Sequence, residues 1–124
     1  MNELIFVSID GNNIGKRLER FILSEKFDDL KSFSDRVSTA IAELSRFIVG
    51  IGGTVLMSGG DNLLAMVPAN ERLSLKRFFD GVQSHDIPFS MGIGRNARAS
   101  FLALKYAKAV EADCIIYEDA FPDA

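Results

Sequence analysis

Two aspartates and two lysines are the residues of this chain whose types and spacing suit chemistry on phosphates. Asp10 ends an apolar run, Asp61 follows a pair of glycines, and Lys105 and Lys108 stand three residues apart near the C-terminus. Carboxylate oxygens bind hard divalent cations, and a bound cation polarises phosphoryl oxygens. Ammonium groups neutralise a polyphosphate. The four side chains therefore predict a site for a metal-bound nucleoside triphosphate, provided that the fold brings them together.

Glycines next to both aspartates suit the same chemistry. Gly59 and Gly60 permit a tight turn and a close approach of the backbone to a phosphate or a ribose. A helix is expected soon after Gly11, and the backbone amides at its start are a candidate anion site.

The apolar periodicity predicts the elements that position these groups. A helix is expected directly after Asn13, a second one capped by Ser34, a short one capped by Asn70, and a last one beginning at Asn96. Strands are expected at residues 4–9, 54–57, 63–67, 89–93 and 114–117, with a glycine-rich hairpin between the second and the third.

The order of these elements predicts an α+β fold of the ferredoxin-like, split βαβ type, with a mixed sheet and helices packed mainly on one face. The hairpin's second strand should lie between the first and second strands, since the crossover makes those two parallel. Asp10 and Asp61 then lie at one edge of the sheet. The last helix should return to that edge and bring Lys105 and Lys108 with it.

Length and composition limit the classes of protein. The 124 residues fit a single domain, 1–124, and a net charge of −3 gives no general attraction for nucleic acid. One cysteine, Cys114, excludes an internal disulfide. The apolar N-terminal run is short and contains Glu3, so a strand is expected rather than a signal peptide. We expect a cytoplasmic protein without stable nucleic-acid or membrane binding.

Every one of these features also has an ordinary structural explanation. Asp10 taken alone suits a turn or a helix cap, and the glycine pair suits a plain hairpin. Because these residues are expected to converge on one edge of the sheet, a metal and triphosphate site is favoured over the ordinary explanations. By contrast, His85 is interpreted as a turn residue and Cys114 as core, and Arg95 and Arg98 are expected at the opposite edge.

Four segments, taken in order, resemble a known family. They are FVSIDGNNIG at 6–15, MSGGDN at 57–62, MGIG at 91–94 and residues 99–108. The set resembles the palm of CRISPR polymerases, which is related to GGDEF diguanylate cyclases, and most of all the minimal CRISPR polymerase family.

The resemblance implies a nucleotidyltransferase that makes a cyclic dinucleotide or oligonucleotide, usually from ATP, in antiphage signalling with a separate effector protein. It implies Mg²⁺ or Mn²⁺, held in a two-metal site by Asp10, the backbone of Gly11, and Asp61. Lys108 would contact the triphosphate. The candidate nucleotide contacts are Gly11, Asn12, Asn13, Gly59, Gly60, Asn62, Lys105 and Lys108.

Two positions depart from related palms, which often carry a second acid where this chain has Asn12 and Asn62. An amide carbonyl can ligate a metal but adds no negative charge. The favoured reaction is an in-line attack of a ribose hydroxyl on an α-phosphate with pyrophosphate leaving, in a homodimer that presents two nucleotides. The alternatives are a catalytically weak palm that binds a nucleotide or cyclic dinucleotide as a sensor, and an RNA-binding domain of the same topology.

Overall fold

Five strands form one mixed sheet in this computed structural model, which describes residues 3–83 and 87–122. The strands are β1 (Leu4–Gly11), β2 (Thr54–Ser58), β3 (Asn62–Pro68), β4 (Phe89–Gly94) and β5 (Cys114–Ile116), in the order β2-β3-β1-β4-β5. Strand β1 is antiparallel to both β3 and β4, and β4 is parallel to β5. Strand β3 thus lies between β1 and β2, which confirms the split βαβ arrangement.

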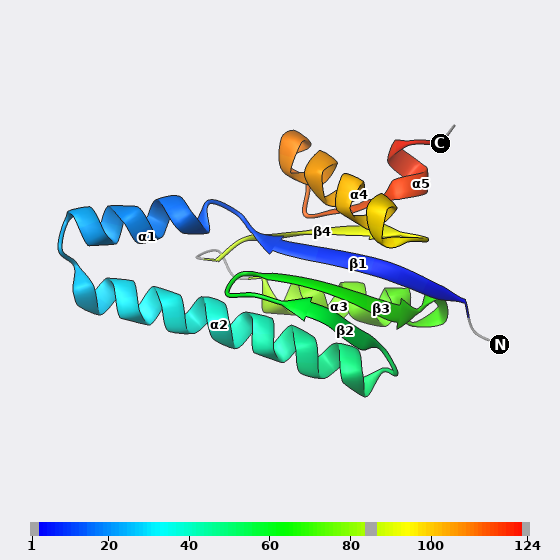
Figure 1. Ribbon diagram of the computed structural model, residues 1–124, viewed down its shortest axis with the longest axis horizontal. Coiled ribbons are helices and arrows are strands. Elements are labelled where there is room, and N and C mark those ends of the chain that lie inside the picture. Colours follow the sequence, from blue (N-terminus) through cyan, green and yellow to red (C-terminus); the bar gives the residue numbers. More distant parts are fainter. Residues whose placement is uncertain (1–2, 84–86, 123–124) are drawn as a thin grey trace.

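The helices are α1 (Ile14–Leu23), α2 (Phe27–Gly50), α3 (Arg72–Val82), α4 (Ala97–Val110) and α5 (Tyr117–Ala120), with a 3₁₀ turn, η1 (Ala69–Glu71), before α3. Helices α2 and α3 cover one face of the sheet, and α1 packs on α2 (Figure 1). Helix α4 lies against β1 and β4 on the opposite face (Figure 1). The predicted α+β class is confirmed, and α4 adds a partial second layer.

The two faces of β1 explain this layering. Val7 and Ile9 are almost fully buried in the core beneath α2 and α3. Burial of one such side chain stabilises a fold by about 1.5–3 kcal/mol. The alternate residue, Ser8, faces α4, where its hydroxyl hydrogen-bonds the hydroxyl of Ser100 at 2.8 Å. Since side chains alternate along a strand, Asp10 lies on the same face as Ser8.

Helix α4 lies so close to β4 that no side chain fits between them. A Cβ on Gly92 would overlap the carbonyl oxygen of Ser100 and the amide of Leu104. The missing side chain therefore sets the height of α4 above the sheet. It also fixes where the last turn of α4, which carries Lys108, meets the end of β1.

Two of the four predicted helix starts are wrong. Ser34 lies inside α2, which begins at Phe27, because Phe33 is fully buried and extends the apolar stripe toward the N-terminus. Asn70 lies in the 3₁₀ turn ahead of α3. The start at Asn96 is confirmed, since the Ala99 amide donates to its side chain at 2.8 Å.

The predicted turn residue His85 lies outside the described residues. Among the helices that the structure describes, none combines the length and the apolar content needed to cross a membrane.

Candidate active site

The end of β1 and the tip of the β2–β3 hairpin meet, which brings Asp10 and Asp61 together. In the sheet, Asp10 pairs with Asn62, and the Gly11 amide donates to the Asp61 carbonyl at 2.9 Å. Burial raises the pKa of Asp61 above its ordinary value, and the charge of Asp10 and a hydrogen bond with its side chain raise it further. The backbone contacts thus place the two aspartates side by side, close enough for the charge of Asp10 to raise the pKa of Asp61.

Lys108 reaches this pair from α4, on the other layer. Its Nζ donates to the carbonyl oxygen of Gly11 at 2.9 Å and lies 3.2 Å from Oδ2 of Asp10. Lys105, one turn earlier, does not contact the carboxylates: its Nζ lies over the Phe101 ring, 5.0 Å from the ring centroid. The structure thus brings Lys108, but not the ammonium of Lys105, to the carboxylates.

The donor set fits a hard cation. The two carboxylates and the Gly11 carbonyl offer oxygen ligands only, which Mg²⁺ and Mn²⁺ prefer. The ammonium group of Lys108 contacts two of these ligands, the Gly11 carbonyl and the Asp10 carboxylate, as a bound cation would. Among the described residues, no group of three or more His, Cys, Asp or Glu side chains is placed to hold a metal. Water and phosphate oxygens would therefore have to complete the coordination, as they commonly do for Mg²⁺.

Asn12 and Asn62, which replace the second acids of related palms, have local structural contacts. The Ser90 hydroxyl donates to Oδ1 of Asn12 at 3.1 Å, and the NH₂ group of Asn12 is the part of this amide that can donate to a phosphate oxygen. The side chain of Asn62 folds over Gly59, where any Cβ would overlap it. Asn13 starts α1 in the left-handed conformation, with φ of 58°.

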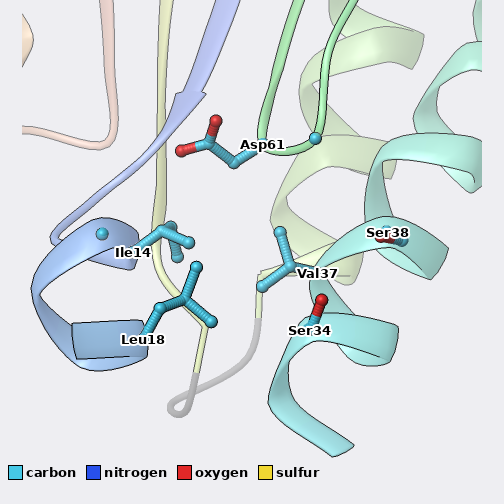
Figure 2. Close-up of a pocket in the computed structure, with 8 residues that line it drawn as sticks. Ile14, Leu18, Ser34, Val37, Ser38 and Asp61 are labelled. Atoms are coloured by element: carbon cyan, nitrogen blue, oxygen red, sulfur yellow. The ribbon is translucent and has the colours of Figure 1, made fainter. Parts of the chain in front are cut away.

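A cavity of about 230 Å³ opens beside Asp61, between α1 and α2 (Figure 2). Its walls are apolar side chains with two hydroxyls: Ile14, Leu18, Val37, Ser34 and Ser38. Sequence reasoning missed this cavity. The available signal was the pair Ser34 and Ser38, which lie one helical turn apart on α2.

Two glycines, Gly15 and Gly60, also line this cavity, and neither is required by the fold. A Cβ on either would meet no atom within 4 Å, and neither has a positive φ. Packing and backbone conformation therefore leave both glycines unexplained, whereas a ligand lying against them would explain both.

A second hollow, of about 380 Å³, lies on the other side of Asp10, between α4 and the uncovered face of β2 and β3. Its lining is mainly apolar and includes Met57, Leu64 and Phe101. Arg98, expected at the far edge, lies on the first turn of α4 and lines this hollow. Arg95 lies at the β5 side, where its Nε is 3.5 Å from a Glu118 carboxylate oxygen.

Several solved structures share this arrangement of strands and helices. An EAL/GGDEF domain protein from M. capsulatus is 20% identical, covers 94% of this chain and 85% of its own, and has a TM-score of 0.62. The GGEEF domain of a diguanylate cyclase from Vibrio cholerae is 20% identical over 92% of this chain and 82% of its own, with a TM-score of 0.60. The Csm1-Csm4 cassette in complex with cA3 is 16% identical over 88% of this chain and 20% of its own, with a TM-score of 0.65.

The fold is thus the palm of GGDEF-type and related nucleotide cyclases. Within that class, the sequence matches the minimal CRISPR polymerase domain over residues 6–117. The chain belongs to the minimal CRISPR polymerase family. No curated protein gives a significant match.

Proposed function

We propose that this chain is a metal-dependent nucleotidyltransferase that joins nucleoside triphosphates, ATP above all, into a cyclic dinucleotide or oligonucleotide and releases pyrophosphate. The observation that carries the proposal is the docking of Asp61 onto the end of β1, which makes one oxygen-rich site out of two distant segments. Membership of the minimal CRISPR polymerase family supports the same conclusion, and we extend it to a role in antiphage signalling.

The two carboxylates and the Gly11 carbonyl would hold Mg²⁺ or Mn²⁺. The bound metal would supply Lewis-acid polarisation of the α-phosphate and charge neutralisation, with one or two ions sharing the site. Lys108 would bind the triphosphate, since its ammonium group lies beside the carboxylates, whereas the ammonium group of Lys105 lies over the Phe101 ring. The amide group of Asn12 and the first amides of α1 would add donors to phosphate oxygens. In this arrangement the protein contributes position and charge rather than a covalent step.

The cavity between α1 and α2 would take the base or the ribose of the nucleotide. Apolar walls suit the faces of a purine, and the hydroxyls of Ser34 and Ser38 suit its polar edge. Gly15 and Gly60 would be glycines because a side chain at either position would occupy the ligand's space.

A second nucleotide requires a second surface, which we assign to another copy of this chain. The hollow beside Asp10 adjoins the uncovered face of β2 and β3, and two of its apolar lining residues, Met57 of β2 and Phe101 of α4, are about half exposed, at 56% and 52%. A homodimer through this face would bury that surface and bring two sites together. A separate effector protein would then sense the product.

The test is to incubate the purified protein with each NTP and Mg²⁺ or Mn²⁺, then measure pyrophosphate and identify products by mass spectrometry. We expect a cyclic product from wild type that is lost in Asp10→Ala and Asp61→Ala. The control is Asp35→Ala, which removes an exposed carboxylate that pairs with Lys31 on α2. Product formation that survives Asp61→Ala would refute the proposal, and so would wild-type protein that makes no product from any NTP.

A nucleotide or cyclic-dinucleotide sensor is the second candidate. It is favoured by one observation, that two positions of the site, Asn12 and Asn62, carry neutral amides whose oxygens make local structural contacts. Tight nucleotide binding without pyrophosphate release would support the sensor over the enzyme.

A further inference from the structure

The ammonium group of Lys108 uses the same oxygens that we assign to the metal. It donates to the Gly11 carbonyl at 2.9 Å and lies 3.2 Å from the Asp10 carboxylate. Its positive charge also lowers the pKa of Asp61, so it acts on all three of the oxygen ligands. In this state the ammonium group already fills the place of a cation and neutralises part of the negative charge of the two carboxylates.

The position of Lys108 is built into the fold. The lysine lies on the last turn of α4, and α4 packs directly on the backbone of β4 at Gly92. The side chain is only 28% exposed and the Asp10 side chain 32%, so the pair is partly withdrawn from water. Lys105, by contrast, is exposed and lies over Phe101.

A divalent ion and an ammonium group on the same two oxygens repel each other strongly at such short range. The ammonium group and a divalent ion therefore compete for the site, and both can bind there only when an anion shares their charge. A triphosphate is such an anion, because its oxygens can bind the metal and the ammonium at once.

We propose that Lys108 occupies the metal site in the nucleotide-free protein, so that a divalent metal binds weakly alone and enters with the triphosphate, which draws the lysine away. Lys108 thus makes metal binding conditional on nucleotide. The inference rests on the proposed function for the identity of the ligands. Because the ion pair is not fully buried, its loss is inexpensive enough for the exchange to be reversible.

The test measures metal binding without nucleotide and without turnover. Mn²⁺ is titrated into wild type, Lys108→Met and Lys105→Met, and the free Mn²⁺ signal is followed by electron paramagnetic resonance. Removal of the competing charge at position 108 should tighten Mn²⁺ binding about tenfold or more, because repulsion at this range is large. Lys105→Met removes the same charge one turn away and should leave Mn²⁺ affinity within about twofold of wild type, as expected for a more distant and exposed charge.

The Lys108→Met substitution should change nucleotide affinity in the opposite direction from Mn²⁺ affinity. With EDTA present, Lys108→Met should bind ATP about tenfold more weakly, because a charge-assisted contact to phosphate is lost. An opposite sign for metal and for nucleotide distinguishes competition for one site from general damage to the protein.

The proposal is overturned if Lys108→Met binds Mn²⁺ no more tightly than Lys105→Met. Lys108→Gln serves as a second variant, and circular dichroism shows that each variant folds. The outcome is separate from that of the product assay. Wild type that makes product while Lys108→Met gains no Mn²⁺ affinity refutes this inference alone. Tighter Mn²⁺ binding in a protein that makes no product refutes the enzyme and leaves the inference standing.

Discussion

Replacing Gly15 should make the protein more stable and its nucleotide binding worse. Gly15 is the second residue of α1, and a Cβ there would meet no atom within 4 Å. Alanine is favoured over glycine in helices by roughly 0.5–1 kcal/mol, and the first turn places the gain near the lower end. A gain of that size raises the melting temperature by about 2–4 °C in a domain of this length. Glycine at position 15 therefore lowers the stability of the folded protein, although the fold does not require a glycine there.

Gly81 supplies the matched control. It is the second-to-last residue of α3, its Cβ would also meet nothing within 4 Å, and it lines neither cavity described above. Alanine and leucine are placed at positions 15 and 81 in turn. Melting is followed by circular dichroism, and ATP affinity by isothermal titration calorimetry with Mg²⁺. All four variants should melt at or above the wild-type temperature, but Gly15→Leu should weaken ATP binding about tenfold or more, since its side chain would fill the ligand's space.

Two results would refute this reasoning. If Gly15→Leu binds ATP as tightly as Gly81→Leu does, the nucleotide does not lie in the cavity between α1 and α2. If Gly15→Ala lowers the melting temperature, the glycine has a structural role that the contacts of α1 do not reveal.

Three further predictions concern α4 and Cys114. Gly92→Ala should lower the free energy of unfolding by about 1–3 kcal/mol in urea titrations, because its Cβ would overlap the Ser100 carbonyl; an unchanged midpoint would contradict the close packing of α4. Ser8→Ala should cost only about 1 kcal/mol by the same measurement, since the Ser100 hydroxyl keeps its bond to the Ala97 carbonyl at 2.8 Å; a loss several times larger would show an unsatisfied hydroxyl. Burial raises the pKa of the Cys114 thiol from 9.0 to about 11. Its thiolate fraction at pH 8 is then lower by about a hundredfold, so iodoacetamide should label the folded protein at least that much more slowly than the unfolded chain, and equal rates would contradict the burial.

The sheet topology could be predicted because it depends on few signals. The apolar run of β1, the glycine-rich hairpin and the parallel crossover predict that β3 lies between β1 and β2, and the observed strand order confirms this. Helix boundaries could not be predicted as well. Ser34 looks like a cap, yet the residue before it, Phe33, is fully buried and α2 begins at Phe27, since tertiary packing outweighs a local capping preference.

Within the site, sequence spacing predicted which backbones meet but not what the side chains do there. Asp10 and Asp61 come together because strand pairing dictates it. The pairing of β1 with β4 brings Asn12 close to Ser90, but the hydrogen bond between their side chains depends on how the chain turns after Gly11. The bond from Lys108 to the Gly11 carbonyl depends on the height of α4 above the sheet. Such details need side-chain geometry, which periodicity does not contain.

Asp10 is held more rigidly than Asp61, and this difference affects which size of ion the two carboxylates can bind. Asp10 lies on β1, which is paired with β3 on one side and β4 on the other up to this residue. Asp61 lies in a turn that one backbone bond from Gly11 attaches to the strand. An ion of larger radius would therefore be accommodated by movement of residues 59–62, and the stiffness of this short turn would set how well the protein tells Mg²⁺ from Ca²⁺, whose oxygen ligands lie about 0.3–0.5 Å farther away.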